Sequence, residues 1–154
     1  MVYKKLYKSF KFAFEGVAYC ISNERNFRIH ITVAAIIYLL SPYYKFTPAE
    51  MIMLTLVIAV VILAEMVNTS VETIVDMITD EFHALAKKAK DVAAGAVLIA
   101  TLCAIMCALF LILRPTVMLF IINDVFRSPV KIVISLLVII LSYLFVKGND
   151  KKNV

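Results

Sequence analysis

The sequence is poor in the residues on which several common catalytic sites depend. Its 154 residues include only three glycines, Gly16, Gly95 and Gly148, and they form no G-x-x-x-x-G-K-S/T pattern. A P-loop that cradles phosphate is therefore excluded. Two histidines, His30 and His83, lack partners at the spacing of zinc ligands. No Ser-His-Asp order or nucleophile elbow supports a hydrolase.

The three cysteines do not form the pattern of a disulfide framework. Cys103 and Cys107 stand four residues apart within an apolar run, and Cys20 lies far away in the sequence. Because no further metal-binding residues are nearby, all three indicate packing rather than a metal site. We also find no internal repeat and no low-complexity linker, and the N-terminal residues lack the pattern of a removable signal peptide.

Apolar residues, in contrast, are abundant. They make up 63% of the chain, and its mean hydropathy is +0.94, whereas a soluble domain is about half apolar. This composition predicts an all-α integral membrane protein that forms one compact bundle. The formal net charge of +5 is clustered at the ends of apolar segments. That placement is typical of membrane topology and argues against nucleic acid as a partner.

Four apolar stretches predict four membrane spans, at residues 27–40, 48–77, 92–113 and 130–146. The first is short for a span of about 20 residues, so we expect it to borrow the end of the preceding helix or to lie in a thinned, protein-packed setting. Thr47 and Pro48 are a good start for the second stretch. Residues 115–127 carry a brief apolar patch followed by Asn123 and Asp124, which predicts an interfacial segment.

The N-terminal residues predict an amphipathic helix on the membrane surface. Apolar side chains recur there at three- and four-residue steps, at Leu6, Phe10, Phe14 and Val17. Basic residues predict that both termini are cytoplasmic. This orientation places inside Lys4, Lys5, Lys8, Lys11, Arg25, Arg28, Lys87, Lys88, Lys90, Lys147, Lys151 and Lys152. It leaves outside Lys45, Arg114, Arg127 and Lys131.

The second stretch carries an acidic stripe within the segment AEMVNTSVETIVD. At about 100° per residue, Glu65, Glu72 and Asp76 fall within about 40° of one another, with Asn68 roughly 60° to one side. A charge inside a membrane is costly unless it is paired, so these residues are expected to face an interior site or a wet cavity. Three uses remain open: a site for Mg²⁺ and a nucleotide, a proton-linked carrier or channel subunit, and a scaffold whose stripe only mediates oligomerisation.

Charged residues from two other segments are expected at the same cytoplasmic boundary. The segment NERNFRIH contributes Glu24 and Arg28, and the loop DEFHALAKKAKD contributes Lys90 and Asp91 at the start of the third stretch. A lysine beside acids suits phosphate binding, whereas a proton relay has little use for it. The pattern therefore favours a nucleotide site over a carrier.

The segments AEMVNTSVETIVD and EFHALAKKAKDVAAGAVLI resemble the signature of the small prokaryotic diacylglycerol kinases. Together with RNFRIH, they are more similar to the undecaprenol kinase branch, and the resemblance covers residues 4–113. It implies a three-span kinase-type helical bundle with an N-terminal amphipathic helix, assembled as a homotrimer with shared active sites. It also implies transfer of the ATP γ-phosphate, with Mg²⁺, to the hydroxyl of undecaprenol or diacylglycerol at the bacterial cytoplasmic membrane.

The same resemblance implies roles for individual residues. Glu65 would be the general base, and Glu24 and Glu72 would hold Mg²⁺. The nucleotide would be bound by Lys90, Asp91, Glu81, Phe82, His83, Lys5 and Phe12. The site would be supported by Asn68, Asp76, Lys8 and Arg28. Residues 1–113 would form the lipid kinase unit, whereas residues 114–154, with an interfacial segment, an additional transmembrane helix and a basic cytoplasmic tail, have no counterpart in the resemblance.

Overall fold

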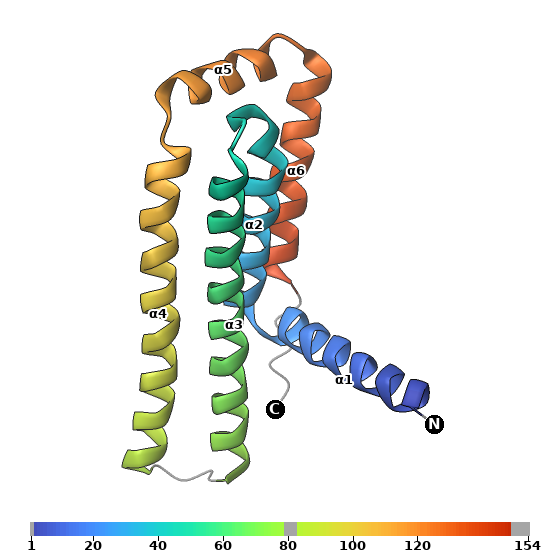
Figure 1. Ribbon diagram of the computed structural model, residues 1–154, viewed down its shortest axis with the longest axis vertical. Helices are drawn as coiled ribbons and strands as arrows, with labels where there is room; N and C mark the ends of the chain where they lie inside the picture. The colour runs from blue at the N-terminus through green and yellow to red at the C-terminus, as the bar shows by residue number, and fades with distance from the viewer. Residues whose placement is uncertain (1, 79–82, 149–154) are drawn as a thin grey trace.

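The chain is helical throughout the part that the structure, a computed structural model, describes: residues 2–78 and 83–148. The helices are α1 (Val2–Asn23), α2 (Arg25–Tyr44), α3 (Pro48–Ile78), α4 (Ala84–Ile112), α5 (Pro115–Phe126) and α6 (Pro129–Lys147). No strand occurs in these ranges, which confirms the prediction of an all-α fold. Figure 1 shows α3 and α4 as a long antiparallel hairpin, with α2 beside α3, α6 beside α2 and α5 across one end.

Three of the described helices, α3, α4 and α6, are long and apolar enough to cross a membrane. The chain is thus a multi-pass membrane protein. Of the four predicted spans, the three that correspond to α3, α4 and α6 meet this criterion of length and apolar character within the described residues. Although α2 has 20 residues, Arg25, Asn26 and Arg28 stand in its first turns and make it less apolar. The 12 residues of α5 are too few to span a bilayer of about 30 Å, as expected for an interfacial segment.

The N-terminal helix α1 and the helix α2 are separate, although the first span was expected either to borrow the end of the preceding helix or to lie in a thinned setting. The chain turns at Glu24, whose extended backbone has φ −106° and ψ 112°, so α2 does not borrow the end of α1. Instead, α2 gains residues at its other end and continues past Pro42. Because Pro42 has no N–H, it cannot bond to the Tyr38 carbonyl. That carbonyl accepts a hydrogen bond from Ser41 Oγ at 2.8 Å, which compensates for the loss.

The basic segment before the third apolar stretch is helical rather than a loop. It forms the first turns of α4, which begins at Ala84 instead of near residue 92. The residue before it, His83, accepts a hydrogen bond from the backbone N–H of Leu85 at 3.3 Å and so caps the helix. Because this segment is helical, Lys90 and Asp91 have fixed positions on α4, about 100° apart around its axis.

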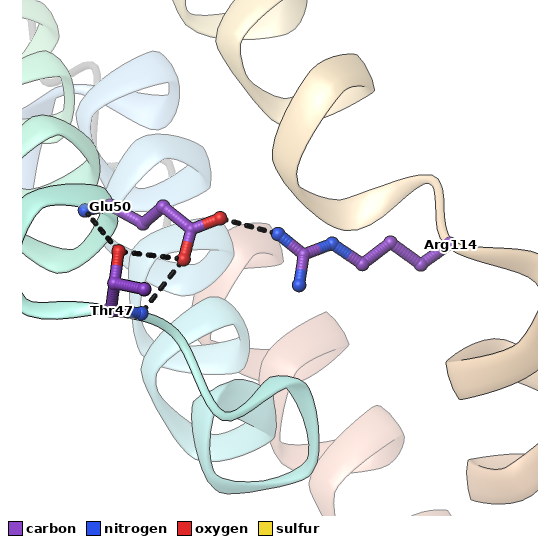
Figure 2. Close-up of polar contacts among 3 residues, drawn as sticks. All are labelled: Thr47, Glu50 and Arg114. Carbon is purple, nitrogen blue, oxygen red and sulfur yellow. Dashed lines mark hydrogen bonds and ion pairs between the residues drawn. The ribbon is translucent and has the colours of Figure 1, made fainter.

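A capping box joined to an ion pair fixes the start of α3 (Figure 2). The N–H and hydroxyl of Thr47 donate to Glu50 Oε2 at 2.7 and 2.9 Å, and the N–H of Glu50 donates to Thr47 Oγ1 at 3.3 Å. Two orphan groups of the first turn are thereby satisfied. Arg114, at the connection from α4 to α5, binds Glu50 Oε1 through Nη2 at 2.5 Å. This network ties the beginning of α3 to the end of α4.

The C-terminal pair α5 and α6 is attached to the other helices at both of its ends. At one end, the Tyr43 hydroxyl of α2 donates to Asp124 Oδ2 at 3.0 Å, and Lys131 Nζ binds the same carboxylate at 2.7 Å. Lys131 and then Tyr43 lower the pKa of Asp124. At the other end, Arg28 Nε donates to the Val146 carbonyl at 3.3 Å. The last turn of α6 therefore lies beside the first turn of α2.

Candidate active site

The most deeply buried acid of the described chain is Glu65, in the middle of α3. It is 2% exposed, in a helix with few buried residues. Its Oε1 lies 3.3 Å from His30 Nε2 of α2, at ion-pair distance but without the angles of a hydrogen bond. Within the described residues, Oε1 has no hydrogen-bond partner. A buried carboxylate oxygen without a hydrogen bond is costly to keep, so the fold leaves this atom available for another role.

Two turns further along α3, the stripe contains a pre-oriented carboxylate, that of Glu72. Asn68 Nδ2 donates to Glu72 Oε1 at 2.8 Å, and both side chains are half-buried. The other polar atom of the amide, Asn68 Oδ1, is buried and receives no hydrogen bond within the described part of the chain. Glu72 and Asn68 thus present oxygens on the same side of α3 as Glu65.

The helical hairpin brings Lys90 to the stripe. Lys90 Nζ of α4 binds Asp76 Oδ1 of α3, with the two side chains 36% and 66% exposed. The contact shows that the start of α4 is level with the Asp76 end of the stripe. Asp91, the next residue, is exposed. Because an exposed ion pair is worth little to stability, Lys90 can exchange its partner for a phosphate at small cost.

The C-terminal end of α1 reaches α3 beside the same stripe. Cys20 is 4% exposed and its thiol bonds to the Thr69 side chain. Burial raises the pKa of Cys20, Thr69 opposes this change, and the carboxylates of Glu24 and Glu65 raise the pKa further. Cys20 and Thr69 line one hollow between α1 and α3. The backbone N–H of Glu24, at the turn between α1 and α2, donates to the Cys20 carbonyl at 2.9 Å, which sets Glu24 one turn from the residue that meets α3.

The remaining candidate residues are dispersed. Lys5, Lys8 and Phe12 are exposed along α1, and His83 is an exposed helix cap. Arg28 is 3% exposed, and its Nη1 donates to the carbonyls of Ile21 and Ser22 at 3.1 and 3.2 Å. Through these bonds and the one to the Val146 carbonyl, Arg28 joins the ends of α1 and α6 to α2. Glu81 and Phe82 lie outside the described residues.

An apolar cavity of about 250 Å³ lies between α2, α3 and α4. Its polar lining residues are His30 and Thr101, among aliphatic side chains such as Val33, Leu54 and Ile58. His30 thus borders both the cavity and Glu65. From the sequence, His30 was excluded as a zinc ligand and given no other role, so this contact was missed. The available signal was its place in the NERNFRIH segment, from which Glu24 and Arg28 were chosen.

The oxygens of the stripe suit an open Mg²⁺ site, which phosphate and water complete, better than a site in which the protein supplies every ligand. Among residues 2–78 and 83–148, no three His, Cys, Asp or Glu side chains form a group that could hold a metal ion. Mg²⁺ in phosphate-transfer sites requires only one or two carboxylates, because phosphate oxygens and water complete its shell. Glu72, oriented by Asn68, and the unpartnered Asn68 Oδ1 fit that requirement.

Comparison with known proteins distinguishes between the possible uses of this stripe. The profile of the family described as prokaryotic diacylglycerol kinase matches residues 11–112. The chain belongs to this family. The matched region contains α2 and α3, most of α1, and α4 to its last residue, whereas α5 and α6 lie beyond it.

Named relatives agree with this membership. A diacylglycerol kinase from Synechocystis sp. is 36% identical over 108 residues, which are 70% of this chain and 62% of that protein. An undecaprenol kinase from Bacillus subtilis is 38% identical over 93 residues, which are 60% of this chain and 76% of that protein. The chain thus spans less than two thirds of the Synechocystis relative. The resemblance and the lipid-kinase prediction are confirmed at the level of the family, and the carrier alternative has no support.

Proposed function

We propose that this diacylglycerol kinase family member transfers the ATP γ-phosphate, with Mg²⁺, to the hydroxyl of undecaprenol or diacylglycerol at the cytoplasmic membrane surface. The carboxylate of Glu65 carries the proposal. It is 2% exposed inside a membrane helix, and its Oε1 has no hydrogen-bond partner among the described residues. An acid that served only to join helices would be expected to have its oxygens satisfied.

Phosphoryl transfer requires positioning and charge neutralisation more than covalent chemistry by the protein. Glu65 accepts the proton of the lipid hydroxyl while the hydroxyl oxygen attacks the γ-phosphorus. The bond from that phosphorus to the bridging β-phosphate oxygen breaks, and ADP leaves. Lys90 moves from Asp76 to the phosphates and neutralises their charge. Mg²⁺, held by Glu24 and Glu72, would supply further neutralisation of the phosphate oxygens.

The remaining candidate residues would surround the nucleotide. Those proposed to bind it are Lys90, Asp91, Glu81, Phe82, His83, Lys5 and Phe12. Those proposed to support the site are Asn68, Asp76, Lys8 and Arg28. The contacts between Asn68 and Glu72 and between Lys90 and Asp76 support this proposal, since each holds a functional group in a defined place.

A homotrimer with shared sites accounts for the separation of the base from the metal-binding acid. Glu65 and Glu72 are about 10 Å apart along an ideal helix, whereas a general base must lie within about 3 Å of its proton. Residues of a neighbouring protomer would close that gap. The large exposed apolar surface of α4, including Leu98, Leu102 and Ile105, is consistent with further helices beside it.

The chain is proposed to consist of a lipid kinase unit, residues 1–113, and an accessory segment, residues 114–154. The boundary agrees with the end of the family match at residue 112. With α2 crossing the membrane as well, both termini would lie in the cytoplasm. The meeting of the start of α2 with the end of α6 supports this arrangement, because Arg28 and Val146 must then lie at one membrane surface.

The activity is tested with the full chain in nanodiscs, using labelled ATP, Mg²⁺ and either undecaprenol or diacylglycerol. Glu65→Gln preserves the shape of the side chain but removes the base, so the rate should fall by about a hundredfold or more. Glu50→Gln is the matched control, because it makes the same change at the far end of α3. It should retain wild-type activity toward the preferred lipid.

Equal background rates for the wild-type chain and Glu65→Gln, with both lipids, would show that the kinase proposal is wrong. The two lipids are assayed side by side because relatives of similar identity are named for different substrates, 36% for a diacylglycerol kinase and 38% for an undecaprenol kinase. The ratio of kcat/KM for the two lipids then identifies the substrate.

A further inference from the structure

The contact between His30 and Glu65 joins two helices at the proposed base. His30 Nε2 of α2 lies 3.3 Å from Glu65 Oε1 of α3, and the side chains are 19% and 3% exposed. The imidazole also borders the apolar cavity between α2, α3 and α4. Apart from His30 itself and Thr101, the lining of that cavity is apolar, so it offers the ring few other polar partners. The carboxylate of Glu65 is thus the polar group that the imidazole meets at 3.3 Å.

Most other side chains near Glu65 are engaged elsewhere or have no donor to offer. Thr69 Oγ1 donates to the backbone carbonyl of Glu65 at 3.0 Å, and Asn68 Nδ2 donates to Glu72. On α4, residues 92–100 are VAAGAVLIA and have no side-chain hydrogen-bond donor. The next residue, Thr101, lines the cavity together with His30, but its hydroxyl makes no hydrogen bond to Glu65 Oε1 within the described residues. The imidazole of His30 is the polar group found at ion-pair distance from that oxygen.

We propose that His30 is a positioning residue that holds the Glu65 carboxylate in the orientation of a general base. This inference rests on the proposed function, in which Glu65 accepts the proton of the lipid hydroxyl. Nε2–H donates to Oε1 and leaves Oε2 for the substrate. A hydrogen bond to one carboxylate oxygen fixes the plane of the group and so orients the other oxygen toward the hydroxyl.

The distance of 3.3 Å between His30 Nε2 and Glu65 Oε1 is slightly longer than a strong hydrogen bond. Catalytic hydrogen bonds are commonly long or poorly aligned in the free enzyme and shorten when the substrate binds. A small rotation of the imidazole aligns Nε2–H with Oε1, which has no competing hydrogen bond within the described residues. The lipid hydroxyl then meets a base that is already oriented.

Three substitutions at one position separate positioning from packing. His30→Gln places an amide N–H near the position of Nε2, whereas His30→Asn places it nearer Nδ1 and too far from Glu65; His30→Leu removes it. The full chain in nanodiscs is assayed for kcat and for the KM of lipid and ATP. His30→Leu and His30→Asn should lose roughly tenfold to a hundredfold in kcat, with each KM within about a factor of two of wild type. His30→Gln should recover most of the loss.

The matched control is Thr32→Val, two residues along α2, where the hydroxyl donates only to the Arg28 carbonyl of its own helix in the described structure. It should keep wild-type kcat. Equal kcat for His30→Gln and His30→Asn would overturn the inference, and so would a loss confined to the KM for lipid. If His30→Leu does not fold, the Gln and Asn variants decide.

The proposed function and the role of His30 can fail separately. If Glu65→Gln remains active, the proposed function itself fails. If Glu65→Gln is inactive while His30→Asn is fully active, only the role of His30 fails.

Discussion

The polar side chains of α3 fall into two groups according to whether the fold uses them. Thr69 is fully engaged: its hydroxyl donates to the Glu65 carbonyl and its side chain bonds to Cys20. Glu65 Oε1 and Asn68 Oδ1, in contrast, are buried without a hydrogen bond in the described structure. Because orphaned buried polar atoms are rare in folded proteins, these two atoms mark the part of the stripe where we propose that the chemistry takes place.

At Glu72, charge and hydrogen bonding can be separated by one substitution. Glu72→Gln keeps an oxygen that accepts from Asn68 Nδ2 but removes the negative charge that would bind Mg²⁺. The Mg²⁺ concentration for half-maximal activity should rise by about tenfold or more, with the KM for lipid unchanged. It is measured by Mg²⁺ titration at saturating ATP and lipid. An unchanged Mg²⁺ requirement would remove Glu72 from the proposed metal site.

At the scale of helices, the notable feature is how α6 is joined to the kinase unit. Arg28 of α2 donates to the carbonyls of Ile21, at the end of α1, and Val146, at the end of α6. A cation at the C-terminal ends of two helices is favourable because their carbonyls carry partial negative charge. Gly148, directly after α6, allows the guanidinium to approach: a Cβ on it would lie 2.8 Å from Arg28 Cζ.

Replacing Gly148 should therefore weaken the attachment of α6. The residue has φ +49°, so Gly148→Ala introduces backbone strain as well as the overlap with Arg28. We expect a loss of stability of about 1–2 kcal/mol, measured as a lower midpoint of thermal unfolding in detergent. Gly95→Ala is the control, because a Cβ at Gly95 meets nothing within 4 Å. If both variants unfold at the same temperature, Gly148 does not constrain the junction.

At the scale of the whole molecule, the number of crossings determines where the termini lie. Three helices, α3, α4 and α6, qualify as spans by length and composition within the described residues. If α2 also crosses, the first turn of α2 and the last turn of α6 lie at the same surface, as the contact from Arg28 to Val146 requires. Three crossings alone would place α1 and the end of α6 on opposite sides.

Topology can be measured with single cysteines in a chain whose native Cys20, Cys103 and Cys107 are replaced. Lys8→Cys and Lys147→Cys should be protected from a membrane-impermeant maleimide added to intact cells. Arg127→Cys, in the turn after α5, should react. Basic residues retained in the cytoplasm are the physical reason for this orientation. Reaction of Lys8→Cys together with protection of Lys147→Cys would indicate that α2 does not cross.

Local sequence patterns were sufficient for several features. Thr47, Pro48 and Glu50 mark the start of α3, and the spacing of Glu65, Glu72 and Asp76 places them on one face of it. The start of α4 at Ala84 was missed, because spans were predicted from apolar character alone and the segment before Val92 is charged, so it resembled a loop. Likewise, the first stretch was expected to end at residue 40, but α2 continues past Pro42, because Ser41 Oγ satisfies the carbonyl that Pro42 leaves free.

The sequence by itself determined that this is a helical membrane protein with an acidic stripe and a family signature, because composition, helical periodicity and motif are properties of residues close together in the chain. Only the tertiary structure decided which of those acids meets a partner. The contact of Glu65 with His30 and that of Asp76 with Lys90 each join residues of different helices. So does the junction of Arg28 with Val146. Such contacts depend on how helices pack, and no local pattern specifies that.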